Sequence, residues 1–173
     1  RRTGSTWMIT SKEDAWGLVA PLLSDVDIQR FEEVIVGVLS AVDPSLELPE
    51  GQRSLASFLG KELSHSGFLR EDLADTLILM AVHADEVSWG LTQSPQAIAD
   101  RIVRRLLSAT DLDAWRTMAW VLPKLAEASP EAFLESVERA LDTGIPALPD
   151  LFQKWESLGF GPGPAYPGLL WAL

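Results

Sequence analysis

Two histidines, in a chain of 173 residues without cysteine, are the side chains best suited to bind a metal. Glu62 and His65 stand three residues apart, and this spacing places both on one face of a helix, as in di-iron helical bundles. A di-iron site needs a second such pair, but the residue three positions before His83 is Met80. A metal-binding helical enzyme domain is therefore a competing hypothesis. Its ligands would be Glu62, His65, His83 and Asp85.

A simpler interpretation places these polar residues at helix ends. His83, Asp85 and Glu86 follow the expected C-terminus of a helix, where such groups usually satisfy the last carbonyls. The sequence contains no Gly-x-Ser-x-Gly nucleophile elbow. Gly60-Lys61 lacks the Ser or Thr that completes a phosphate loop. We therefore predict no catalytic residue, no metal ligand and no cofactor, and a chain that is not an enzyme.

The charge of the chain limits its expected partners. Its 14 basic and 25 acidic residues give a net charge of −11, a field that repels phosphate backbones. Arg101, Arg104 and Arg105 form a small basic face at helical spacing. We interpret it as a solvated face paired with nearby Asp100 and Asp111, and expect no nucleic acid partner. No apolar run approaches the ~20 residues of a membrane span, so we expect no membrane contact and a cytoplasmic location.

Apolar residues recur at helical spacing along most of the chain, with capping residues between the periodic segments. Pro123 is expected to kink its helix, Gly67 to end another in the left-handed conformation, and residues 45–50 to form a linker. The predicted helices are 11–21, 27–42, 55–67, 69–84, 95–106, a kinked one from about 110, 130–141, and one opening at Pro167. The expected core residues are Ile35, Leu77, Met80, Ile102, Leu122 and Phe133.

Helix pairs recur at a fixed distance along the sequence. They begin near Asp25, Phe68 and Asp111, so both intervals are 43 residues, within the range of HEAT and armadillo repeats. We predict an all-α fold of antiparallel helix pairs stacked as an irregular HEAT/armadillo-like array. An orthogonal helical bundle is the alternative, because the third unit is shorter than the others. Stacked helix pairs usually present an elongated binding surface.

Seven tryptophans are many for a chain of this length. Such residues fill gaps between helices or anchor interfaces with other proteins. Trp115 and Trp120 stand five residues apart and point to different faces, so at least one leaves the core stripe of its helix.

The two ends of the chain differ in character. We expect residues 1–10 to be disordered or extraneous to the domain. Residues 11–173 are expected to form a single all-α helical-repeat domain, truncated at its C-terminus from a longer chain. The last segment is apolar, and Leu170 and Trp171 are expected to dock on the preceding helix pair. The open end would promote self-association.

Several packing motifs together resemble a known group of proteins. These motifs are 59–61, 65–67, 69–70, 73–77, 121–127, 130–134 and 168–173. They resemble the helical region of large, mostly uncharacterised bacterial multidomain proteins that often carry a P-loop ATPase or effector domain. The resemblance implies a non-catalytic scaffold or sensor module that binds a protein partner or other domains of the same chain. The alternative it implies is a regulatory arm of a P-loop ATPase in signalling or defence. It carries over no functional residue.

Overall fold

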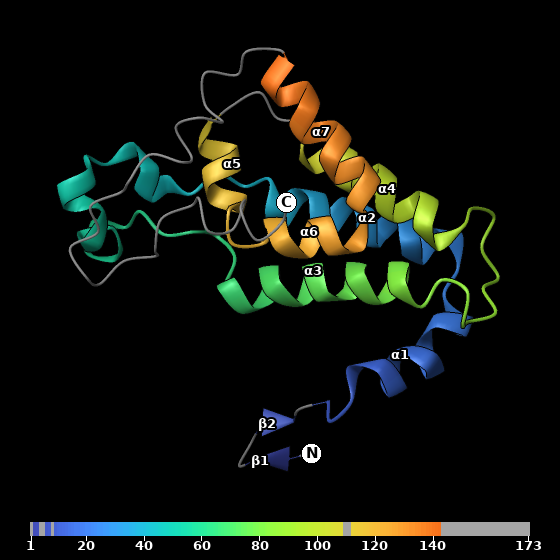
Figure 1. The fold of residues 1–173 in the computed structure, drawn as a ribbon. Helices are drawn as coiled ribbons and strands as arrows, with labels where there is room; N and C mark the ends of the chain where they lie inside the picture. Colours follow the sequence, from blue (N-terminus) through green and yellow to red (C-terminus); the bar gives the residue numbers. More distant parts are fainter. Residues whose placement is uncertain (1, 4–5, 8, 109–111, 143–173) are drawn as a thin grey trace.

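Helices dominate the part of the chain that the computed structural model describes, which is residues 2–3, 6–7, 9–108 and 112–142 (Figure 1). The α-helices are α1 (Lys12–Val19), α2 (Asp25–Leu39), α3 (Gly67–Val82), α4 (Pro95–Leu106), α5 (Leu112–Met118), α6 (Leu122–Ala128) and α7 (Pro130–Asp142). Short 3-10 helices are η1 (Ala20–Leu22), η2 (Pro44–Glu47), η3 (Glu50–Leu55) and η4 (Ser57–Leu59). The predicted all-α class is confirmed. The repeat arrangement stays a prediction.

Two very short strands lie in the segment for which the sequence suggested disorder. β1 (Arg2–Thr3) and β2 (Thr6–Trp7) pair antiparallel, with Arg2 opposite Trp7 and Thr3 opposite Thr6. The expected helix at Pro167 and the docking of Leu170 and Trp171 lie outside the described residues.

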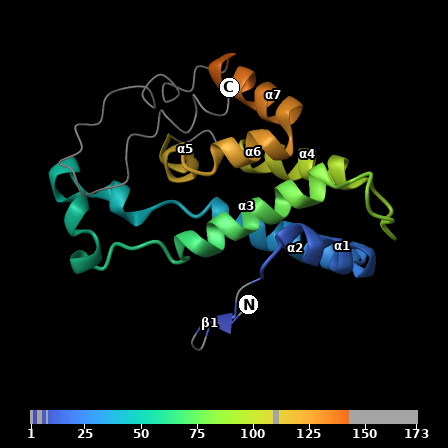
Figure 2. The same cartoon turned by 60° about the horizontal axis from the view of Figure 1, so that its bottom comes forward.

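The long helices pack around α3 and α4. α3 packs against α6 and α4, α4 packs against α7, and α2 contacts both α3 and α4 (Figures 1 and 2). α1 lies on the side of α3 away from α6. Residues 44–66 leave this helical body between α2 and α3 as an arm of 3-10 turns (Figure 2).

The predicted core is confirmed. Trp115 is fully buried whereas 42% of Trp120 is exposed, as the spacing of these tryptophans predicted. The expected core residues that are buried are Ile35, Leu77, Met80, Ile102, Leu122 and Phe133.

The prediction of a helix over residues 55–67 is wrong. The chain instead forms the 3-10 turns η3 and η4, which end at Gly60 with a φ of 69°. That left-handed conformation favours glycine, so Gly60 holds the role that the sequence suggested for Gly67. Gly67 instead opens α3, because the Ser66 side chain caps the helix by accepting from Leu69 N. The expected linker 45–50 includes part of a further 3-10 turn, η2, capped by Asp43.

Other helix boundaries also differ from expectation, among them the end of α2, which lies at Leu39 and not at residue 42. α2 begins two residues earlier than predicted, since Ser24 and Asp27 form a reciprocal capping box. The helix expected to kink at Pro123 is two separate helices, α5 and α6. Pro123 is the second residue of α6, a position where its missing N–H breaks no helical hydrogen bond.

A fully buried arginine joins three of the helices. Arg70, in the first turn of α3, is 0% exposed and donates to the carbonyls at the end of α2. Its Nη1 lies 2.7 Å from Val38 O, and its Nη2 lies 3.0 Å from Leu39 O and 3.4 Å from Thr117 O in α5. Burial lowers the pKa of Arg70, but an arginine stays charged at any ordinary pH. The guanidinium thus satisfies helix-terminal carbonyls of the kind that a helix leaves without backbone partners.

Replacing Arg70 should weaken the fold strongly. Arg70→Met removes the donors of three carbonyl groups and should lower the free energy of unfolding by about 3 kcal/mol or more. Arg70→Lys keeps the charge but loses the fork of donors, so its loss should be smaller. Arg30→Met, at an exposed position of α2, is the matched control and should change stability by less than about 0.5 kcal/mol. Urea unfolding measures all three, and equal effects of Arg70→Met and Arg30→Met would contradict the structural role of Arg70.

Candidate functional site

The residues that the sequence singled out as metal ligands lie at opposite ends of α3. Glu62 and His65 precede the helix, whereas His83 is its C-cap and Asp85 lies beyond it. A helix of 16 residues spans about 24 Å at a rise of about 1.5 Å per residue, so the two pairs cannot share one ion. His83 Nδ1 instead lies 2.6 Å from Glu86 Oε2. Among the described residues, no group of three His, Asp or Glu side chains is placed to hold a metal.

The purified chain should therefore contain metal only in substoichiometric amounts. Elemental analysis after dialysis measures iron, manganese and zinc directly. His83→Ala and His65→Ala should leave the metal content unchanged, because neither residue belongs to a ligand cluster in the described part of the chain. One equivalent of metal that is lost in either variant would restore the metal-site hypothesis.

The arginines on the basic face of α4 pair with acidic residues that differ from those expected from the sequence. Arg101 and Arg105 both pair with Glu32 of α2, at 2.7 Å and 3.3 Å. Arg104 Nη2 lies 3.0 Å from Glu135 Oε2 of α7. Asp100, one of the expected partners, accepts hydrogen bonds from Gln96 and Ser129 instead. The other expected partner, Asp111, lies outside the described residues.

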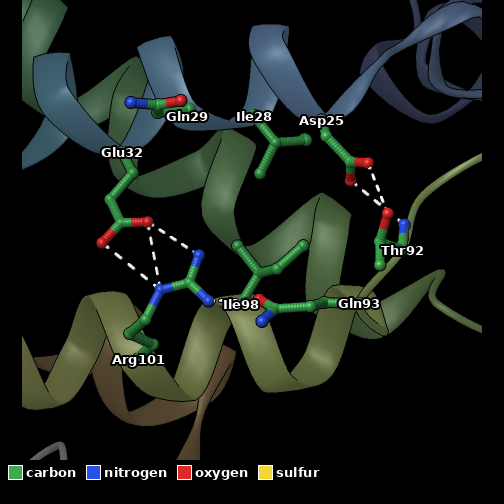
Figure 3. Close-up of a pocket in the computed structure, with 8 residues that line it drawn as sticks. All are labelled: Asp25, Ile28, Gln29, Glu32, Thr92, Gln93, Ile98 and Arg101. Atoms are coloured by element: carbon green, nitrogen blue, oxygen red, sulfur yellow. Dashed lines mark hydrogen bonds and ion pairs between the residues drawn. The ribbon is translucent and has the colours of Figure 1, made fainter.

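A polar cleft of about 350 Å³ lies between α2 and the start of α4 (Figure 3). Asp25, the first residue of α2, accepts hydrogen bonds from Thr92 N at 3.0 Å and Thr92 Oγ1 at 2.6 Å. At the other end of the cleft, Arg101 Nη2 and Nε donate to Glu32 Oε2 at 2.7 and 3.1 Å. Arg101 also donates to Gln93 Oε1. Glu32 and Arg101 thus form an ion pair across the cleft, whereas Asp25 is held by the uncharged Thr92.

This pairing shifts the pKa of both carboxyl groups. The Arg101 hydrogen bond, with the charges of Arg101 and Arg105, holds the pKa of Glu32 below its ordinary value despite partial burial. Hydrogen bonds from Thr92 lower the pKa of Asp25 in the same direction. Chemically, the cleft links α2 to α4, and each of its charged groups already has a hydrogen-bond partner. We call it the α2–α4 clasp.

The α2–α4 clasp should make stability fall in acid. Because the pKa of Glu32 is lower in the folded chain, its stabilisation is complete above about pH 4.5 and is lost as the pH falls through the folded pKa. The stability difference between the wild type and Glu32→Gln should therefore shrink below about pH 4.5. Ile98→Val, in the same cleft, removes neither a titrating group nor a hydrogen bond and should give a constant difference. Urea unfolding from pH 7 to pH 3 tests this, and a constant difference for Glu32→Gln would refute it.

A second feature is an exposed apolar run on α1 and η1. Residues 18–23 are six consecutive apolar residues, of which only Ala20 is buried. Leu18 is 76% exposed, Val19 48% and Leu22 80%. Leu18 and Leu22 are four residues apart and so share one face of the helical segment. We call Leu18, Val19 and Leu22 the outer α1 face.

The opposite side of α1 docks on the helical body through three contacts. Lys12 Nζ lies 3.0 Å from Asp72 Oδ1 and 2.7 Å from Asp75 Oδ2, both on α3. Hydrogen bonds from Lys12 to Asp75 and Asp72 raise the pKa of Lys12 to about 12. The Trp16 ring lies 5.7 Å from that of Trp89, at an interplanar angle of 57°. Ala20 is fully buried beside them.

This docking is incomplete. An apolar cavity of about 150 Å³ lies under α1, and Trp16 Nε1 is buried without a hydrogen-bond partner among the described residues. An unpaired buried donor costs about 1–3 kcal/mol, and an unfilled apolar cavity costs further packing energy. The residues lining the cavity are Trp16, Val19, Leu23, Asp27, Ile28, Phe31, Thr76 and Met80. We call this space and its walls on α2 and α3 the α1 groove.

Neither the outer α1 face nor the α1 groove was found by sequence reasoning. The signal for the outer face was present, since six consecutive apolar residues cannot all lie on one side of a helix. The α1 groove left no comparable signal, because its walls come from three separate segments of the chain.

Comparison with known proteins supplies no further assignment: no family model, curated protein or solved structure matches this chain. Within the described residues, none of the helices has the length and apolar character needed to cross a membrane.

Proposed function

We propose that this chain is a non-catalytic helical module that binds a protein partner through the outer α1 face. The observation that carries the proposal is the exposure of Leu18, Val19 and Leu22. Consecutive exposed apolar residues are unfavourable in water unless another surface covers them. A module of this kind serves as a scaffold or sensor within a larger protein.

The surroundings of the outer α1 face indicate the chemistry of the partner. Glu13 and Asp14 lie exposed on the same helix, and Asp25 and Asp27 open the next one. Val26, near the start of α2, is a further apolar residue that is 58% exposed. A complementary partner presents an apolar surface with basic residues at its edge.

Other exposed apolar residues are less suited to form one interface. Phe58 and Phe68 are 88% and 82% exposed, but they belong to η4 and α3. The outer α1 face combines adjacent positions with a shared helical face, and so presents a more continuous surface.

Site-specific photo-crosslinking tests the proposal. A benzophenone amino acid at position 18 or 22 of the chain should give the same crosslinked protein in an extract of the source cells. The same probe at Leu134, which is 45% exposed on α7, is the matched control and should not give that product. Excess unlabelled wild-type chain should abolish the product, whereas excess Leu18→Ser/Leu22→Ser chain should not.

The double variant must remain folded for this comparison. Because both leucines are exposed, its free energy of unfolding should stay within about 1 kcal/mol of the wild type. Identical products at positions 18 and 134, or no product at 18 and 22, would refute the proposal. A crosslinked product with the mass of two copies of the chain would show that the outer α1 face binds a second copy of the chain and not another protein.

A further inference from the structure

The inner side of α1 carries a regular recognition pattern. Lys12, Trp16 and Ala20 stand at intervals of four residues and so form one stripe along the helical segment. Lys12 pairs with two aspartates on α3, Trp16 contacts the Trp89 ring, and Ala20 is fully buried. α1 thus lies in the α1 groove as a bound amphipathic helix lies on its receptor.

The connection to the rest of the chain permits α1 to leave. Leu23 and Ser24 separate η1 from α2, and both have extended backbone, with ψ angles of 137° and 165°. Rotation at Leu23, which precedes the Ser24–Asp27 capping box, would move α1 without breaking the cap of α2.

α1 does not fill the α1 groove completely, so another helix could pack in it more tightly. The cavity of about 150 Å³ remains unfilled, and Trp16 Nε1 remains unpaired within the described structure. A helix with a larger aliphatic side chain over Phe31 and Met80 would fill this space. Asp72 and Asp75 would select a basic residue one turn before its aromatic anchor.

We infer that the α1 groove is a helix-binding site whose internal occupant is α1. An amphipathic helix of another protein, with a basic residue followed four positions later by an aromatic one, displaces α1 and takes its place. Leu18 and Leu22 of the outer α1 face do not line this site, although Val19 borders both, so the inference does not rest on the proposed function.

A peptide in trans tests the inference. The probe is a fluorescein-labelled peptide of residues 10–24, titrated with the full chain and followed by fluorescence anisotropy. Trp16→Ala in the full chain removes the main anchor of the internal helix. The peptide should bind this variant about tenfold more tightly than the wild type, because the internal competitor is weakened. Equal affinity for both chains, or no binding to either, would overturn the inference.

Charge exchange tests the register of the bound peptide. A peptide with Lys12→Glu should bind the Trp16→Ala chain about tenfold more weakly, since it places like charges side by side. Adding Asp72→Lys to the chain should restore that binding. Asp72 is chosen because Asp75 also pairs with Lys124 of α6. Failure of the rescue would show that the peptide does not lie in the α1 groove.

A third peptide separates this inference from the proposed function. The Leu18→Ser/Leu22→Ser peptide should bind as well as the unchanged one, because neither leucine lines the groove. Loss of binding for this peptide alone would show that the peptide binds through the residues of the outer α1 face, and would overturn the inferred binding in the α1 groove. If Trp16→Ala lowers the helix content of the chain, Lys12→Glu in the full chain loosens α1 without removing a buried ring.

Discussion

The guanidinium of Arg70 is the interaction on which the rest of the described fold depends. Three helices meet at this one group. From the start of α3, it donates hydrogen bonds to the terminal carbonyls of α2 and to a carbonyl of α5. No apolar side chain can satisfy carbonyl groups at that depth. With α2 and α3 fixed at one end by Arg70, their apolar faces can close on α4 and α6.

The described molecule combines a fully satisfied region with a weakly docked one. Across the α2–α4 clasp, each charge meets a partner on the facing element. Under α1, by contrast, a cavity and an unpaired indole N–H remain, and three apolar side chains face outward. Regions of low local stability are where proteins place segments that move or bind. The weakly docked region of this molecule is therefore the part that both functional proposals concern.

The sequence predicted the helices with strong periodicity and caps, and it failed where tertiary contacts decide. α4 and α7 match their predicted ranges to within one residue, and all the expected core positions are buried. Only residues 55–67 of the 3-10 arm were predicted to be helical, because Leu55, Phe58 and Leu59 have helical spacing, yet all three side chains are exposed in the described structure. Arg70 gave no signal, since its acceptors are backbone carbonyls that no side-chain pattern encodes. The partners of Arg101 were missed for a related reason, as Glu32 lies far away in the sequence.

The contact between Trp16 and Trp89 has an optical consequence. Two indole rings 5.7 Å apart and inclined by 57° have transition dipoles that couple, and such coupling gives paired circular dichroism bands of opposite sign. The coupling falls steeply with separation, so it exists only while α1 lies against the loop that carries Trp89. The circular dichroism of this tryptophan pair therefore reports whether α1 is docked on the helical body, in solution and without an attached label.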